Sequence, residues 1–183
     1  MTTTQYMIKH TENWVSDVIV KYNICPFARR EVERGSIRYA LIEESKKKKV
    51  LQSLLDECRY LDEHSETETT LFIMPSGFEG FYAFLDLVDM ANDLLDLEGY
   101  EGVYQLANFH PDYCFAEEPQ SEPSNYTNRS PYPTLHIIRE KSMEMAINNH
   151  PDVDAFPERN IEFANKKGND FFVNLLATCI LNK

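Results

Sequence analysis

The chain has 183 residues, of which 43% are hydrophobic and 12% aromatic, and such a composition is typical of a globular protein rather than a disordered one. Its length fits one domain spanning residues 1–183. The net charge of -12 makes nucleic-acid backbones and anionic membranes unfavourable partners. The sequence shows no secretion signal and no apolar run long enough to span a bilayer, so we expect an acidic, cytoplasmic protein.

Hydrophobic periodicity predicts helices that alternate with strands in the first 110 residues, followed by helices alone. In chain order we expect a helix that ends near Asn23, a short helix over 27–34, strands over 37–42, 71–74 and 103–109 separated by helices over 46–58 and 78–97, and then helices over 135–149, 157–167 and after Asp170. This order predicts an α/β fold with a small, mainly parallel sheet of three or more strands, flanking helices and a helical C-terminal part.

A polar, proline-rich loop from His110 to Pro133 follows the last predicted strand. In parallel sheets the carboxyl ends of the strands share one edge, where ligands usually bind. The segments 75–77 and 110–113 should therefore emerge side by side, and we expect the loop to build the functional site.

Several segments together resemble the bacterial family catalogued as domain of unknown function 1415. They are Asn23–Ala28, Glu68–Leu71, Gln105–Phe115, Asn128–His136 and Arg139-Glu140. The resemblance runs from about Trp14 to the segment after Leu135 and implies a single-domain bacterial protein. The family carries no established activity, so the resemblance leaves the cofactor unknown, and the roles below come from chemistry alone.

Three residues are candidate catalytic groups. His110 ends a strand before a proline and has the near-neutral pKa of a general acid or base, with Tyr113 close behind it. Cys25 precedes Pro26, and we expect it to cap the short helix, where the helix dipole and nearby arginines favour a nucleophilic thiolate. The alternatives are a hydrogen-bonded structural histidine and a small buried cysteine.

Arg129 is the first basic residue after a long acidic stretch, and its guanidinium suits a carboxylate or phosphate. An internal salt bridge is the alternative. The expected ligand-binding residues are Arg129, Asn128, His136, Arg139 and Glu68. We expect His136 and Arg139 to lie on the polar flank of a helix.

Metal binding is considered because His110 and Cys114 are four residues apart, with Cys25 or His136 as further ligands, but the spacing matches no known zinc pattern and no metal site is predicted. The aspartates at 86, 89, 93 and 96 should form a solvated helix face.

Three hypotheses follow for the function. The first is an enzyme that acts on a small anionic metabolite at the His110–Pro133 loop. The second is a non-catalytic small-ligand or metal-binding module, and the third is a protein-interaction scaffold. The oligomeric state cannot be read from the sequence.

Overall fold

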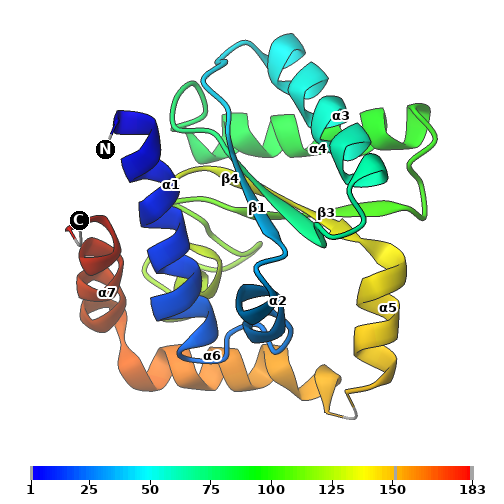
Figure 1. Ribbon diagram of the computed structural model, residues 1–183. Coiled ribbons are helices and arrows are strands. Elements are labelled where there is room, and N and C mark those ends of the chain that lie inside the picture. Colours follow the sequence, from blue (N-terminus) through cyan, green and yellow to red (C-terminus); the bar gives the residue numbers. More distant parts are fainter. Residues whose placement is uncertain (1, 151, 182–183) are drawn as a thin grey trace.

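The computed structural model describes residues 2–150 and 152–181, and it contains a four-stranded sheet with helices on both faces (Figure 1). The strands are β1 (Ile37–Leu41), β2 (Thr69–Ile73), β3 (Tyr104–Phe109) and β4 (Thr134–Arg139), in the spatial order β1-β2-β4-β3. β1 and β2 pair in parallel, whereas β4 runs antiparallel to both of its neighbours. The predicted α/β class is confirmed.

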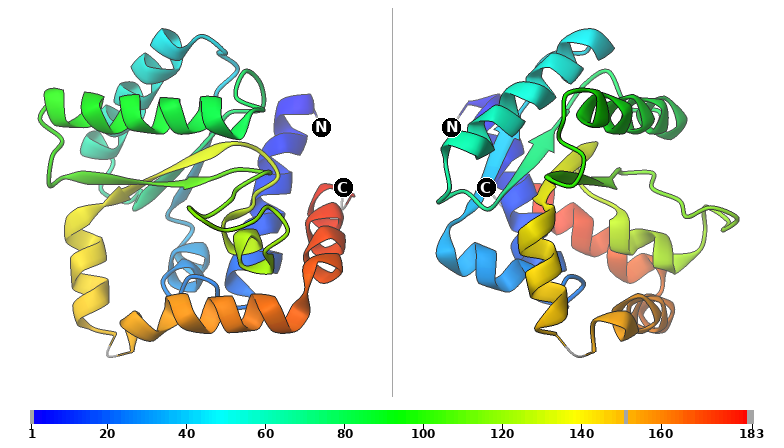
Figure 2. Two further views of the ribbon diagram at one scale, coloured as in Figure 1. Left: turned by 180° about the vertical axis from the view of Figure 1, so that it is seen from behind. Right: turned by 90° about the vertical axis from the view of Figure 1, so that its right-hand side faces the viewer.

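Helices α3 (Lys47–Glu63) and α4 (Phe81–Leu97) cover one face of the sheet, and both views in Figure 2 show them on the same side. Their inward stripes meet side chains of β2, β3 and β4 in the larger hydrophobic core. Its fully buried members include Leu54, Leu61, Phe72, Phe84, Leu87 and Ile137. Burial of large apolar side chains on this face is the main stabilising contribution to the fold.

The other face of the sheet is covered more loosely by the N-terminal and C-terminal helices. These are α1 (Thr3–Trp14), which continues as the π-helix η1 (Val15–Val20), α2 (Ala28–Arg34), α5 (Glu140–Asn148), α6 (Phe156–Lys167) and α7 (Asn169–Leu181), with short 3-10 turns η2 (Pro123–Asn128) and η3 (Val153–Ala155) between them. A second core cluster forms here around Trp14, Val18, Ile19 and Leu71. In Figure 1, α5 runs downward from the sheet, and α6 lies across the bottom of the molecule, roughly perpendicular to α5.

The prediction of a mainly parallel sheet is wrong because a helix was expected from residue 135 onward. The segment Thr134–Arg139 is instead strand β4, which lies between β2 and β3, and α5 begins only at Glu140. Leu135 and Ile137 face the larger core, while His136 and Ile138 face the opposite side. That alternation is the period-2 pattern of a strand.

Two predicted helix ends are confirmed by backbone geometry. Asn23 has a φ of 54° after the first helical segment, and Gly99 has a φ of 82° just beyond α4. Both are the left-handed conformation that terminates helices. The expected capping role of Cys25 is wrong, because α2 begins one residue later than its predicted start and Phe27 is its N-cap residue.

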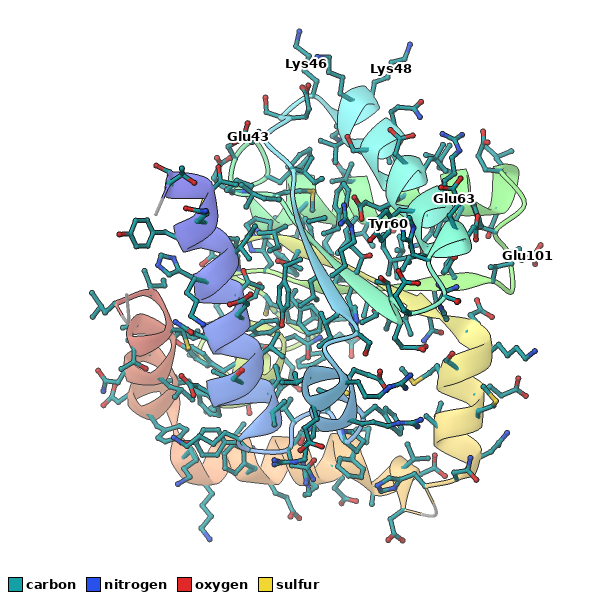
Figure 3. The ribbon with its side chains drawn as sticks, in the orientation of Figure 1. Glu43, Lys46, Lys48, Tyr60, Glu63 and Glu101 are labelled. Atoms are coloured by element: carbon teal, nitrogen blue, oxygen red, sulfur yellow. The ribbon has the colours of Figure 1, made fainter. Side chains whose placement is uncertain are left out.

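Charged side chains lie on the exposed surfaces of α3 and α4, as the sequence predicts for the aspartates of α4. Lys46 and Lys48 project from the beginning of α3 (Figure 3), and the four aspartates of α4 are exposed. Among residues 2–150 and 152–181, the structure holds no helix with both the length and the apolar character needed to cross a membrane.

The tight turn after β2 supplies a test of the fold. Gly77 has a φ of 89°, and a Cβ atom there would lie 2.7 Å from Cβ of Ser45. We expect Gly77→Ala to lower the free energy of unfolding by roughly 2–4 kcal/mol, because it adds a steric clash to an unfavourable backbone angle. Urea denaturation measures the change.

Gly99→Ala is the matched control, since Gly99 has a similar φ of 82° but nothing within 4 Å of the added Cβ. It should cost only about 1 kcal/mol for the backbone angle. Equal losses in the two variants would mean that the packing of the turn against Ser45 is not as described.

Candidate functional site

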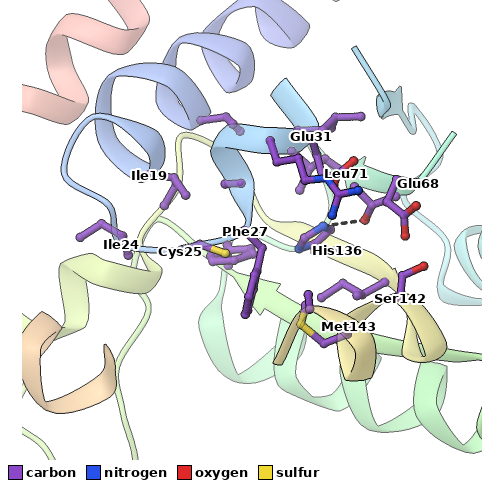
Figure 4. A pocket seen from close by; sticks show the side chains of 18 of the residues that line it. Ile19, Ile24, Cys25, Phe27, Glu31, Glu68, Leu71, His136, Ser142 and Met143 are labelled. Carbon is purple, nitrogen blue, oxygen red and sulfur yellow. Dashed lines mark hydrogen bonds and ion pairs between the residues drawn. The ribbon is translucent and has the colours of Figure 1, made fainter. Parts of the chain in front are cut away.

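A pocket of about 710 Å³ lies between the second face of the sheet and the helices below it. Its roof is formed by β1, β2, β3 and β4, and its walls come from the segment 24–34, from α5 and from α6. Figure 4 shows the pocket with Cys25 and Phe27 on one side of His136 and Glu68 on the other. A cavity of this volume is large enough for a small molecule.

Apolar side chains line most of the pocket. The innermost wall belongs to the second core cluster, where the ring of Trp14 packs edge-on against Phe109 with centroids 5.0 Å apart. The outer wall is α5, which contributes Met143, Met145 and Ala146. The remaining apolar members are Val15, Ile19, Ile24, Phe27, Ala28, Ile37, Leu71 and Ile138.

His136 projects from β4 into this apolar surrounding. Its Nε2 atom lies 2.6 Å from Oγ1 of Thr69, which itself lies 2.5 Å from the carbonyl oxygen of Ile137. Burial lowers the pKa of His136 to about 4, because the charged imidazolium would lose its hydration. The ring is therefore neutral near pH 7.

Cys25 lines the pocket with a partly buried thiol. Burial raises the pKa of Cys25, and the backbone N–H groups of Phe27 and Ala28 partly offset this by hydrogen bonding to the sulfur. The Cys25 thiol makes no hydrogen bond to His136, although both residues line the pocket. Cys25 is thus a neutral thiol here rather than an activated thiolate.

The charged residues of the pocket come from α2 and from Glu68, which directly precedes β2. Arg30 and Arg34 flank Glu31, with N···O distances of 3.8 and 3.5 Å, and their side chains are 74% and 50% exposed. Glu68 also lines the cavity, and its carboxylate makes no hydrogen bond or ion pair with any described residue. The pocket therefore has charges of both signs.

His110 lies outside the pocket and is fully buried on the other face of the sheet. Its Nε2 donates to the carbonyl oxygen of Phe78 at 3.0 Å, and its Nδ1 accepts from the backbone N–H of Asp112 at 2.9 Å. Burial lowers the pKa of His110 and outweighs the opposing effect of the Phe78 carbonyl. With both nitrogens engaged, the geometry favours a structural role. The Phe78 contact does bring the segments after β2 and β3 together, as expected from the sequence.

Arg129 is also enclosed, with 9% of its surface exposed. It donates to the carbonyl oxygens of Tyr113 at 3.1 Å and Gln120 at 2.9 Å, and it stacks over the ring of Tyr126. The sequence predicts that Arg129 binds a ligand or forms an internal salt bridge. Its contacts are instead hydrogen bonds to Tyr113 and Gln120. Arg129 instead closes the 110–133 loop on itself.

The remaining predicted residues are divided between the pocket and other locations. Arg139 donates to the carbonyl oxygen of Leu61 in the last turn of α3 and to those of His64 and Thr67 just beyond it, and Tyr113 packs against Phe81. Of the eight predicted site residues, the pocket brings together Cys25, Glu68, Asn128 and His136 and leaves out His110, Tyr113, Arg129 and Arg139. The long loop contributes only Thr127 and Asn128.

Sequence reasoning did not find Trp14, Thr69, Arg30, Arg34 or the α5 side chains as members of this site. The four-residue spacing of Arg30 and Arg34 on one helix was a signal that could have been used. Across residues 2–150 and 152–181, no three His, Cys, Asp or Glu side chains are grouped closely enough to hold a metal ion.

Comparison with known protein families identifies the family of the chain. The model of the family described as "Protein of unknown function (DUF1415)" matches residues 6–174. The chain belongs to this family. No curated protein and no solved structure matches the chain significantly. The geometry of the pocket is therefore the basis for a functional proposal for this DUF1415 protein.

The enclosed position of Arg129 predicts an effect on stability. Arg129→Gln should lower the free energy of unfolding by about 1–3 kcal/mol, because the enclosed guanidinium and its hydrogen bonds to the carbonyl oxygens of Tyr113 and Gln120 are lost. Arg30→Gln, at an exposed arginine, is the control and should have a much smaller effect. Urea denaturation of both variants measures this, and equal effects would contradict the buried role of Arg129.

His136 predicts a pH dependence. Its folded-state pKa of about 4 lies below the unfolded value of about 6.5, so the unfolded chain binds more protons between these values. The stability contributed by neutral His136 is complete above pH 7 and is lost as the pH falls toward 4.

We therefore expect His136→Gln to lose less stability than the wild type between pH 7.5 and pH 5, by about 1–2 kcal/mol. Urea denaturation at both pH values measures the difference. An identical pH dependence in the two proteins would show that His136 titrates normally in the folded state.

Proposed function

We propose that this DUF1415 protein binds a small, largely apolar molecule in the pocket between the sheet and helices α2, α5 and α6. The observation that supports this is a cavity of about 710 Å³ whose walls are largely apolar and also include polar side chains such as His136, Glu68 and Arg34. Ligand sites in proteins have this combination, because apolar walls supply affinity and isolated polar groups fix orientation.

The packing of α5 supports the same proposal. None of its nine residues is fully buried, and Met145 and Ile147 are 51% and 40% exposed. The helix nevertheless turns Met143 and Ala146 toward the pocket. A bound apolar molecule would cover these side chains and increase the buried area of α5.

We further propose that an acidic group of the ligand binds near Arg30 and Arg34. The sequence-based expectation of an anionic ligand relied on Arg129, whose donors are used within the loop. Arg30 and Arg34 line the pocket instead, and both are largely exposed. Arginine binds carboxylate and phosphate groups through its planar set of donors.

Catalysis at this pocket and docking of a protein partner remain predictions. The catalytic hypothesis needs a base near the Cys25 thiol, and no hydrogen bond joins that thiol to His136 in the described part of the chain. Burial also raises the pKa of Cys25, which disfavours the nucleophilic thiolate. Binding is accordingly the function that the geometry supports best.

A pair of fluorescent probes tests the proposal. N-phenyl-1-naphthylamine is apolar, and 1-anilinonaphthalene-8-sulfonate adds an acidic group to the same body. We expect both to bind once per chain, and Ala146→Phe to weaken both at least tenfold, since Ala146 lines the cavity and a phenyl ring would fill part of it. Fluorescence titration measures the affinities.

Ala83→Phe on the exposed surface of α4 is the matched control and should leave both affinities unchanged. Replacing Arg30 and Arg34 together with Gln should weaken only the sulfonate probe. Binding that is unaffected by Ala146→Phe would refute the pocket as the binding site, while equal effects of the double Gln variant on both probes would remove only the acidic-group proposal.

A further inference from the structure

The hydrogen bonds of His136 determine which of its ring nitrogens carries a proton. Oγ1 of Thr69 lies 2.5 Å from the carbonyl oxygen of Ile137 and 2.6 Å from Nε2 of His136. A hydroxyl group has one hydrogen, and a carbonyl oxygen has none to offer. The hydroxyl must therefore donate to the carbonyl and accept from the imidazole, so Nε2 is protonated.

The second ring nitrogen then has a fixed role. A neutral imidazole protonated at Nε2 has a lone pair at Nδ1, which can only accept a hydrogen bond. The lowered pKa of His136, about 4, keeps the ring in this neutral form near pH 7. The hydrogen bonds of Thr69 to Ile137 and His136 thus make Nδ1 of His136 a hydrogen-bond acceptor toward the pocket.

No described residue donates to this Nδ1 atom. Cys25 and Ser142 line the same cavity and carry donors, but neither is hydrogen-bonded to His136. Glu68, on the other side of His136 in Figure 4, adds a second group that accepts hydrogen bonds and has no partner among the described residues.

We propose that Nδ1 of His136 accepts a hydrogen bond from the ligand, so that the pocket selects small apolar molecules that carry a hydroxyl or amine donor. This inference rests on the proposed function and names the chemistry that the site recognises. A ligand without a donor would cover Nδ1 and leave it unpaired, which weakens binding because a buried acceptor loses its hydrogen bond to water.

The first test concerns the imidazole itself. Nitrogen-15 NMR of the histidine side chains should show His136 as the Nε2–H tautomer at pH 7. Thr69→Val should disturb this tautomer, because the hydroxyl that accepts from Nε2 is removed. Thr70→Val is the control, since Oγ1 of Thr70 is buried and has no hydrogen-bond partner. Detection of the Nδ1–H tautomer in the wild type would overturn the inference.

The second test compares two ligands that differ in one donor. We expect 2-naphthylmethanol to bind the wild type about 3–10-fold more tightly than its methyl ether, which keeps the oxygen but has no hydrogen to donate. Calorimetric or fluorescence titration gives the ratio. Thr69→Val should reduce it toward one by weakening only the alcohol, and Thr70→Val should preserve it.

The outcomes separate this inference from the proposed function. Equal binding of alcohol and ether to the wild type would refute donor recognition and leave the apolar pocket in place. Failure of both compounds to bind would reject the pocket as a ligand site and the inference with it. A preference for the alcohol that persists in Thr69→Val would show that another group than His136 recognises the donor.

Discussion

The pairing of β4 on both of its edges is the constraint on which the rest of the structure depends. β4 forms antiparallel ladders with β2 and β3, and without it these two strands would have no common neighbour. Backbone hydrogen bonds in both directions fix its register, and a shift by one residue would exchange its two faces. Leu135 and Ile137 would then leave the larger core, and His136 would enter it.

Two histidines lie in different environments on the two faces of the sheet. His110 lies at the end of β3 among the rings of Phe81 and Phe84, with both nitrogens hydrogen-bonded to backbone groups. His136 is bonded at one nitrogen only and faces the cavity. Burial lowers the pKa of both, but only His136 keeps a nitrogen for a ligand. Position relative to the sheet, rather than residue type, distinguishes their roles.

The looser packing of the second sheet face follows from how that face is covered. α3 and α4 present continuous apolar stripes to the first face, whereas α5 has no fully buried residue and α2 has none either. The helices below the sheet surround the pocket instead of filling it. The protein thus combines a closely packed half, which supplies stability, with a more open half that contains the pocket.

Patterns along the chain were sufficient for most local elements and for the family. Period-3.6 stripes identified α3 and α4, the residues suited to a left-handed conformation identified helix ends at Asn23 and Gly99, and a short apolar run identified β2. These features depend on neighbours in sequence. Four of the eight expected site residues, including Cys25 and His136, also lie in the pocket.

Tertiary structure alone decided the place of β4 and the composition of the site. A six-residue segment with two possible periodicities becomes a strand only when two partner strands offer hydrogen bonds, and no local signal reports those partners. The same holds for Thr69 and His136, which are 67 residues apart in sequence and meet because β2 and β4 are paired. The sequence by itself determined the class of fold and the available chemical groups, while long-range strand pairing determined which of those groups face the pocket.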